Sequence, residues 1–223
     1  MKRITNKQLF HDFSKTLATE LFEQYEYPWE ILSHIGDAIK ELGTSLSAEE
    51  YDQIGEDVWI SKAAVVAPTA SINGPAIIGP DTEVRHCAFI RGNALVGANC
   101  VVGNSVELKN VILFDHVQTP HYNYVGDSIL GYYSHMGAGS ITSNVKADKT
   151  LVAVKIGDTK TSTDRKKFGA ILGDYVEIGC NSVLNPGTVV GANSNVYPLS
   201  MVRGYVPADS IYKNSEDVVI KQK

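Results

Sequence analysis

The sequence predicts an all-β solenoid, a parallel β-helix preceded by a short helical appendage. Two observations carry this prediction: an aliphatic residue recurs at every sixth position over long stretches, and glycine follows several of these positions. A period of six fits neither an α-helix nor an alternating hairpin, but it fits a triangular coil with three six-residue sides. Each side would then point one aliphatic side chain into a continuous core.

The appendage, residues 1–50, is predicted to contain two helices. Thr5 is a suitable N-cap for the first helix, and Pro28 suits the start of the second, which Gly43 would end. The first apolar stripe consists of Leu9, Phe13, Leu17 and Leu21, and the second of Ile31, Ile35 and Ile39. Each stripe recurs every four positions, and we expect both to pack on the end of the solenoid.

The solenoid is predicted over residues 51–206, with the repeat itself visible from Ile54 to Arg203. Its first block of aliphatic positions comprises Ile54, Ile60, Val66, Ile72, Ile78, Val84, Ile90, Val96, Val102 and Leu108. The register returns at Leu130, Met136 and Thr142, and again at Leu172, Ile178, Leu184, Val190, Val196 and Val202. The alternative, an antiparallel sandwich of short strands, would require hairpin turns about every 8–12 residues, and we disfavour it.

Two stretches interrupt this register. The first, Phe114 to Ile129, adds four residues beyond whole repeats, because Leu108 and Leu130 lie 22 positions apart. The second, residues 145–167, contains two β-like runs and predicts a protruding loop or hairpin. Functional groups of a solenoid concentrate at such interruptions. Residues 207–223 form a polar tail, which we expect to be partly disordered beyond a short strand or helix.

The composition excludes several classes of function. A formal net charge of -5 and 43% hydrophobic residues are typical of a soluble globular protein and give no electrostatic case for binding nucleic acid or an anionic membrane. No stretch approaches the roughly 20 apolar residues of a membrane span, and the N-terminus lacks the apolar core of a signal peptide. We therefore expect a cytoplasmic protein. Cys87, Cys100 and Cys180 are odd in number and lack CxxC spacing, which favours free thiols.

The segment from Val106 to Asn144 is the richest in chemistry. It contains three of the six histidines, His116, His121 and His135, together with Lys109, Tyr122, Tyr124 and Asp127. The glycines of its MGAGS turn, residues 136–140, would let a ligand approach the backbone and would expose N–H donors. Asp127 itself fits a corner residue that accepts hydrogen bonds from turn amides.

This segment resembles a known family, the hexapeptide-repeat acetyltransferase domain of the bifunctional enzymes that make UDP-N-acetylglucosamine, in the version attached to archaeal-type sugar-1-phosphate nucleotidyltransferases. The resemblance covers about Arg91 to Arg203. Its most specific motifs are HYNYVGD at 121–127, GAG at 137–139, TSN at 142–144 and KF at 167–168. It implies a left-handed winding, which the period alone does not determine and which opposes the usual right-handed crossover.

The resemblance implies transfer of acetyl from acetyl-CoA to the amine of a hexosamine-1-phosphate, with glucosamine-1-phosphate as the first choice. It assigns the general base to His121, which would deprotonate the attacking amine. It assigns the residue that orients this imidazole to Glu107 and an oxyanion-stabilising N–H to Ala138. No metal ion is part of this chemistry.

The resemblance also implies a set of binding residues. Sugar and phosphate contacts fall on Arg91, Lys109, Tyr124 and Asn144, followed by either Lys149 or Lys167, because the second interruption displaces the family's lysine. Localised cations are needed to hold a phosphate on an acidic protein. Acetyl-CoA would lie between solenoids of a homotrimer and contact Ala138, Cys180 and Pro198. His135 stands where the bacterial enzymes have a substrate-binding asparagine, so galactosamine-1-phosphate stays open as the acceptor.

Two other functions are compatible with the fold. A γ-type carbonic anhydrase would hold zinc on three histidines across a subunit interface, for which His86, His116 and His121 are available, with Gln118 nearby. A non-catalytic scaffold that binds sugar phosphates would use the appendage for docking. We expect the nucleotidyltransferase half to be absent, because the residues before Ile54 are too few for its nucleotide-binding sheet. A separate nucleotidyltransferase is then the expected partner.

Overall fold

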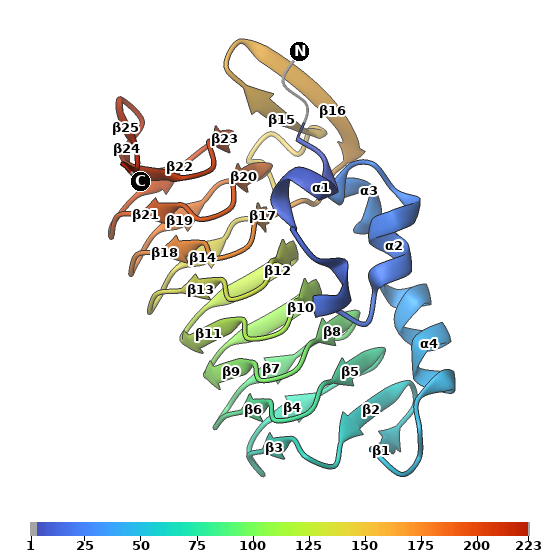
Figure 1. Cartoon of the computed structure of the whole chain (residues 1–223). Coiled ribbons are helices and arrows are strands. Elements are labelled where there is room, and N and C mark those ends of the chain that lie inside the picture. The colour runs from blue at the N-terminus through green and yellow to red at the C-terminus, as the bar shows by residue number, and fades with distance from the viewer. Residues whose placement is uncertain (1–3, 223) are drawn as a thin grey trace.

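The computed structural model describes residues 4–222, and its main body is a left-handed parallel β-helix (Figure 1). Successive coils pair in parallel with a regular offset, as in Val58, Ala76 and Ala94, which are Cα partners 18 residues apart. The predicted fold class is confirmed. Within residues 4–222, no helix is both long enough and apolar enough to span a membrane.

Each coil has three sides. The first side carries β2 (Val58–Ser61), β5 (Ala76–Ile78), β8 (Ala94–Val96), β17 (Ala170–Leu172), β20 (Thr188–Val190) and β23 (Tyr205–Val206). The second carries β3 (Val65–Val66), β6 (Glu83–Val84), β9 (Val101–Asn104), β11 (Gln118–His121), β13 (His135–Met136), β18 (Glu177–Ile178), β21 (Asn195–Val196) and β24 (Ser210–Asn214). The third carries β4 (Ser71–Ile72), β7 (Phe89–Ile90), β14 (Ile141–Thr142), β19 (Val183–Leu184) and β22 (Met201–Val202).

Two longer strands, β10 (Glu107–Leu113) and β12 (Tyr124–Leu130), run through the corner from the third side to the first. In the coil before β10, the two core residues that flank this corner, Ile90 and Val96, are six positions apart. Their partners in β10, Leu108 and Leu113, are only five positions apart. Coils that include these strands are therefore 17 residues long. The interpretation of Phe114 to Ile129 as an insertion is wrong, because each of two coils has instead lost one corner residue.

The aliphatic repeat fills the interior as predicted, with Ile78, Ile90 and Val102 fully buried. The first predicted repeat position is wrong. Ile54 is 61% exposed, because β1 (Tyr51–Gly55) turns back antiparallel on β2 and lies outside the coil. The inward column begins only after this hairpin.

The appendage is more broken than predicted. Its elements are α1 (Asn6–Leu9), a 3-10 turn (Phe13–Lys15), α2 (Thr19–Gln24), α3 (Pro28–Ile31) and α4 (Ile35–Ser45). Asp12 caps the 3-10 turn by accepting from the Ser14 N–H, and this breaks the first predicted helix. Leu17 is consequently 40% exposed. Gly43 lies inside α4 against the Trp59 ring, where a side chain would not fit, and does not end the helix.

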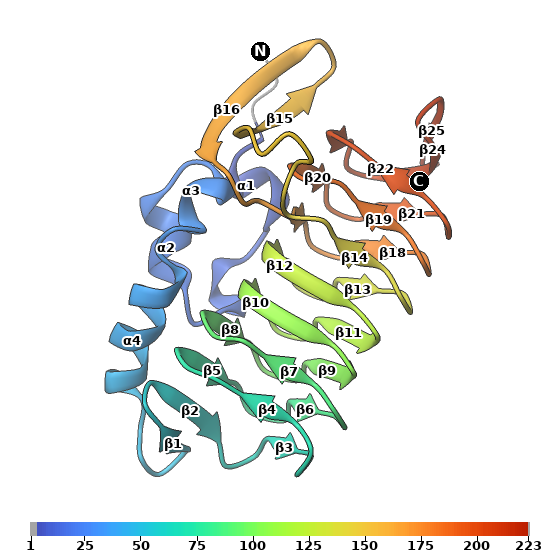
Figure 2. The same ribbon diagram turned by 180° about the vertical axis from the view of Figure 1, so that it is seen from behind.

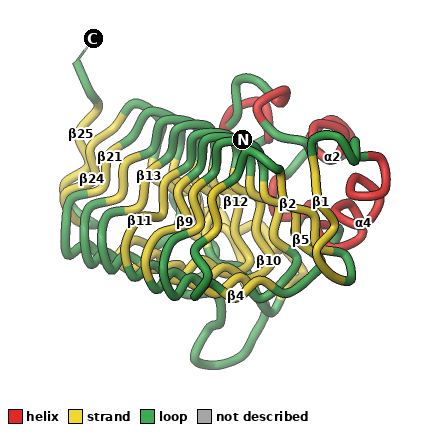
Figure 3. Tube along the Cα trace, turned by 90° about the horizontal axis from the view of Figure 1, so that it is seen from below, coloured by secondary structure: helices red, strands yellow, loops and turns green. Residues whose placement is uncertain are grey.

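The helices lie along one flank of the stacked coils and do not cap their end (Figures 1 and 3). Their apolar side chains pack there around Phe114, which stacks on Phe10 with ring centroids 4.9 Å apart and meets Phe22 edge to face. Backbone hydrogen bonds from Asp174 to Leu9 and from Asp115 to Lys15 fix the segment to two distant coils. The expected packing on the solenoid end is therefore wrong.

Residues 145–167 contain the antiparallel pair β15 (Val152–Ile156) and β16 (Thr159–Arg165), which projects beyond the coils (Figure 2). Val152 and Val154 are buried against the solenoid, so the hairpin packs on the coils. In the tail, β24 extends the second side and β25 (Asp217–Ile220) folds back on it. The ordered part of the tail thus extends further than its polar composition indicates.

Candidate active site

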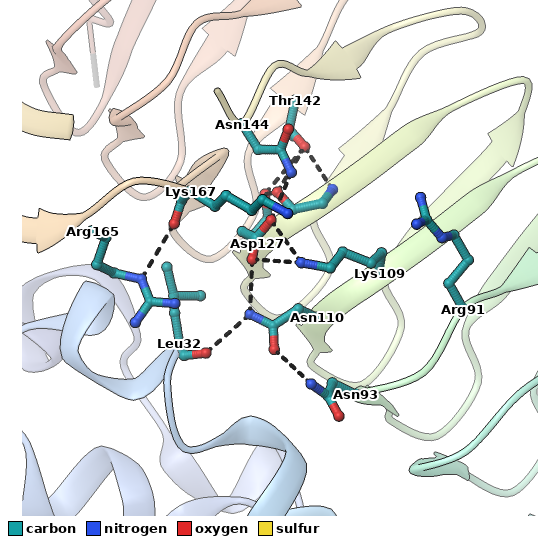
Figure 4. A network of polar contacts seen from close by, with 12 residues as sticks. Leu32, Arg91, Asn93, Lys109, Asn110, Asp127, Thr142, Asn144, Arg165 and Lys167 are labelled. Atoms are coloured by element: carbon teal, nitrogen blue, oxygen red, sulfur yellow. Dashed lines mark hydrogen bonds and ion pairs between the residues drawn. The ribbon is translucent and has the colours of Figure 1, made fainter. Parts of the chain in front are cut away.

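A buried carboxylate organises the corner that follows the third side (Figure 4). Asp127 is 2% exposed and accepts from Lys109 Nζ at 3.1 and 3.2 Å. It also accepts from Asn110 Nδ2 at 3.1 Å and from Asn144 Nδ2 at 2.6 Å. The expectation that Asp127 accepts from turn amides is wrong, because these side chains reach the carboxylate from the preceding and the following coil. A charge this deeply buried is stable only when so partnered.

The network reaches both the outer face and the appendage. Asn144 Nδ2 donates to the Tyr124 hydroxyl at 3.1 Å, and Asn110 Nδ2 donates to the Leu32 carbonyl at 3.0 Å. Burial raises the pKa of Tyr124, and the nearby carboxylates of Asp127 and Glu107 raise it further. The phenol therefore keeps its proton and can donate it to a ligand oxygen.

Arg91 continues this site onto the preceding coil. It holds the same position in its coil as Lys109 does in the next, because Ile90 pairs with Leu108. Its Nη1 donates to Glu107 Oε1 at 2.6 Å, in a pair whose side chains are 46% and 34% exposed. The structure thus brings Arg91, Lys109, Tyr124 and Asn144 together along one strip of the third side.

His121 lies at a different corner, between the second and third sides. Its carbonyl accepts from the Gly139 N–H at 3.0 Å, and the Ala138 and Cys180 carbonyls accept from the corresponding residues of the following coils. His121, Ala138, Cys180 and Pro198 therefore succeed one another, coil by coil, along one edge. Within residues 4–222 the exposed His121 imidazole makes no hydrogen bond, and its ring centroid lies 6.3 Å from that of Tyr122.

The expected hydrogen bond between Glu107 and His121 is not formed in the described chain, because Arg91 holds the Glu107 carboxylate. The orienting role of Glu107 stays a prediction. At Ala138 the geometry is more direct. The N–H groups of Gly137 and Gly139 donate to backbone carbonyls at 2.7 and 3.0 Å, whereas the Ala138 N–H has no acceptor among the described residues. It is a free donor one coil away from His121.

The two alternative lysines differ in position. Lys149 is exposed in the loop before β15, whereas Lys167 follows β16 and its side chain extends toward Asp127 and Asn144 (Figure 4). Sequence analysis missed Arg165, which donates from Nε to the Lys167 carbonyl at 3.3 Å. Burial lowers the pKa of Arg165, and the nearby Asp127 opposes that shift. Its position inside a polar run gives no sequence signal, since only the hairpin places it beside the network.

The remaining histidines lie elsewhere. His135 Nδ1 lies 2.8 Å from Glu177 Oε2 on the second side. His116 stacks on Tyr133 at 4.3 Å at the corner after the first side, whereas His86 contacts the Thr69 hydroxyl through Nδ1 at 2.7 Å. The three histidines considered for zinc are thus not brought together within this chain. Across residues 4–222, no cluster of three or more histidine, cysteine or acidic side chains is arranged to hold a metal ion.

Comparisons with known proteins give one family and several relatives. The family model described as the GMPPB C-terminal domain matches residues 72–218. The bifunctional protein GlmU of Methanococcus aeolicus is 34% identical over 202 residues, which cover 88% of this chain and 48% of the relative. The bifunctional sugar-1-phosphate nucleotidylyltransferase/acetyltransferase of Sulfurisphaera tokodaii is 29% identical over 160 residues, covering 72% and 38%. The chain spans about half the length, or less, of these curated relatives.

Among solved structures, a hexapeptide transferase family protein from Anaplasma phagocytophilum superimposes with a TM-score of 0.44 at 14% identity. That match covers 74% of this chain and 81% of the other. The acetyltransferase domain of PglB from Neisseria gonorrhoeae, solved with acetyl coenzyme A, gives a TM-score of 0.36 at 15% identity and covers 74% and 58%.

Proposed function

Since the chain belongs to the GMPPB C-terminal domain family, we propose that it is an acetyl-CoA-dependent N-acetyltransferase whose acceptor is a hexosamine-1-phosphate, with glucosamine-1-phosphate first. The name of the Sulfurisphaera tokodaii relative, which pairs sugar-1-phosphate nucleotidylyl transfer with acetyl transfer, supports this activity. One observation carries it furthest. A strip of phosphate-suited cations, Arg91 and Lys109, adjoins a corner where the His121 imidazole and the Ala138 N–H have no partner among the described residues.

In the proposed reaction, the phosphate of the acceptor binds the Arg91 and Lys109 cations. Tyr124 and Asn144 contact the sugar beside them, and Lys167 adds a further positive charge. This anchors the ring so that its amine faces the His121 corner. Arg91 remains available for this role although it pairs with Glu107, because guanidinium groups present several donors.

The amine nitrogen attacks the thioester carbonyl carbon while the His121 imidazole accepts a proton from it. The carbonyl oxygen becomes an oxyanion, which the Ala138 N–H stabilises. Collapse of this intermediate breaks the carbon–sulfur bond and expels the thiolate of coenzyme A. The thiolate then takes up the proton that His121 holds, so the imidazole is restored for the next turnover.

We further propose that acetyl-CoA lies along the edge formed by Ala138, Cys180 and Pro198, with a neighbouring solenoid of a homotrimer as the second wall. Leu199 and Met201, which are 80% and 62% exposed near this edge, support an intersubunit groove. The N-acetylated sugar phosphate would pass to a separate nucleotidyltransferase in the cytoplasm.

The proposal is tested by following free thiol while acetyl-CoA is mixed with the protein and a panel of amines. Glucosamine-1-phosphate, galactosamine-1-phosphate and unphosphorylated glucosamine separate the demand for phosphate from the choice of sugar. Release of coenzyme A that requires the phosphate is expected. Sugar-phosphate binding without any thiol release would overturn the proposed activity and favour a non-catalytic scaffold.

A further inference from the structure

A second basic site lies where the β15–β16 hairpin overhangs the corners of the later coils. A pocket of about 580 Å³ is enclosed there by the hairpin, the loop before it and the solenoid. That volume is of the size that organic ligands occupy. Four cationic side chains, Lys146, Lys155, Lys160 and Arg203, line the pocket, against one acidic lining residue, Asp148.

The hairpin places two of these cations directly opposite each other. Lys155 and Lys160 are cross-strand partners of β15 and β16, an arrangement that is destabilising for like charges. Lys146 is paired with Asp148 at 3.3 Å. The other three, Lys155, Lys160 and Arg203, have no acidic partner within residues 4–222. An anion in the pocket would relieve this repulsion.

Contacts within the chain hold the walls of the pocket in place without a ligand. Val152 and Val154 anchor β15 to the solenoid and are 1% and 0% exposed. Gly204 adopts a φ of +74°, and a Cβ there would stand 2.8 Å from the Lys155 carbonyl oxygen. Only glycine allows this close approach of hairpin and coil. The lysine pair is therefore held over the corner by packing and backbone contact.

The pocket also continues the strip described above. Thr142 pairs with Leu184, and Leu184 with Val202, so the residues that follow them are stacked on successive coils. These residues are Ser143, Asn185 and Arg203, and all three line the pocket. Each of them occupies the same position in its coil as Arg91 and Lys109 occupy in the preceding coils. The line of anion-suited groups thus runs past the Asp127 network and into the pocket.

We propose that this pocket binds a diphosphate attached to a nucleoside, the chemistry that nucleoside diphosphates and coenzyme A share. Three unpaired cations match the two to three negative charges of a diphosphate better than those of a single phosphate monoester. The volume leaves room for the nucleoside beside the phosphates. This site goes beyond the proposed acetyl transfer and does not depend on it, because it uses none of the residues assigned to the reaction.

Binding is measured by calorimetric titration of the full chain with inorganic pyrophosphate, UDP and coenzyme A as probes. The test variant combines Lys155→Gln with Lys160→Gln. The control combines Lys40→Gln with Lys62→Gln, which removes two exposed lysines from another part of the molecule and changes the net charge equally. We expect the pocket variant to weaken binding about tenfold or more and the control to leave it within about twofold.

Binding of UDP that the pocket variant loses would assign the pocket to a nucleotide-linked sugar, and binding of coenzyme A that the pocket variant loses would assign it to the nucleoside end of the acetyl donor; both support the proposal. Binding of pyrophosphate alone would overturn the nucleoside part. No binding of any probe at millimolar concentration, or an equal loss in the control, would overturn the site. His121→Ala must bind like the wild type, which separates this result from the fate of the proposed acetyl transfer.

Discussion

Two corners of the same coils are built in opposite ways. At the network corner, defined by Lys109, Asn110, Asp127 and Asn144, each polar side chain has a partner within the chain. At the open corner, defined by His121 and Ala138, the His121 N–H and both backbone carbonyls are hydrogen-bonded, but the imidazole and the Ala138 N–H are free within the described residues. The polar side chains of the first corner are paired before any ligand binds, whereas the free groups of the second are left for a ligand or a neighbouring chain.

The largest expected effect is on activity at the open corner. His121→Ala should lower kcat/KM for acetyl transfer by about 10²- to 10⁴-fold, the usual contribution of a general base. It should leave the unfolding midpoint nearly unchanged, because no side-chain hydrogen bond is lost. Thiol release and thermal unfolding measure the two quantities.

The matched control is His86→Ala, which removes a histidine from the same edge two coils earlier. Activity in this control should match that of the wild type. Equal activity of the wild type and His121→Ala would show that the free imidazole takes no part in the reaction.

Substitution at the network corner should lower the free energy of unfolding. Asp127→Ala leaves the Lys109 amine without its carboxylate, and breaking a buried ion pair in this way costs about 3–5 kcal/mol of unfolding free energy. Urea denaturation measures the loss. Asp158→Ala, at an exposed position in the hairpin turn, is the control and should stay within about 0.5 kcal/mol of the wild type. A loss no larger than in this control would mean that the network does not hold its corner.

Glu107 lies between the two corners, and its substitution separates two roles. If Glu107 orients His121 in the assembled enzyme, Glu107→Gln should lower kcat about tenfold. If it only positions Arg91, the KM for the sugar phosphate should rise while kcat is unchanged. Steady-state kinetics with the sugar phosphate varied tell these apart, and Arg91→Gln provides the reference for a pure KM effect. A pure KM effect of Glu107→Gln would remove it from the catalytic set.

The smallest effect concerns the thiols. Cys180 is exposed on the edge of the open corner, and Cys180→Ser should keep activity within about twofold, since no thiol chemistry is proposed. Burial raises the pKa of Cys100 to about 12. A thiol reagent at pH 8 should therefore label Cys87 and Cys180 in the folded protein and Cys100 only after unfolding, as mass spectrometry of the digest would show. Rapid labelling of Cys100 in the folded protein would contradict this burial.

The residues of both corners were named from the resemblance, but the hydrogen bonds that join the network corner were not, for a physical reason. His121, Ala138, Cys180 and Pro198 lie in motifs that can be recognised along the chain. The partners of Asp127 depend instead on which residues the corners stack, and Asn110 reaches the Leu32 carbonyl 78 positions away.

The spacing between Leu108 and Leu130 can be fitted to whole repeats in two ways. The 22 positions from Leu108 to Leu130 are four more than three repeats but two fewer than four. The structure selects the second solution, with one residue lost in each of two coils. The long strands β10 and β12 that result carry Lys109 and Asp127 through the corner. No count along the sequence separates these solutions, because only the pairing of the strands does.

The attachment of the N-terminal helices has a consequence for how the molecule is made. The His11 N–H donates to a side-chain oxygen of Asp174, 163 positions later, and the backbone contacts of Leu9 and Lys15 also wait for residues of much later coils. During translation this segment emerges before the coils that it contacts and finds its partners late. Until those coils are made, its aromatic side chains are exposed to water and must avoid aggregation. Closing such a long loop also makes folding slower than in a solenoid whose contacts form only between successive coils. The last contacts to form would then include some that join the helical segment to coils synthesised much later.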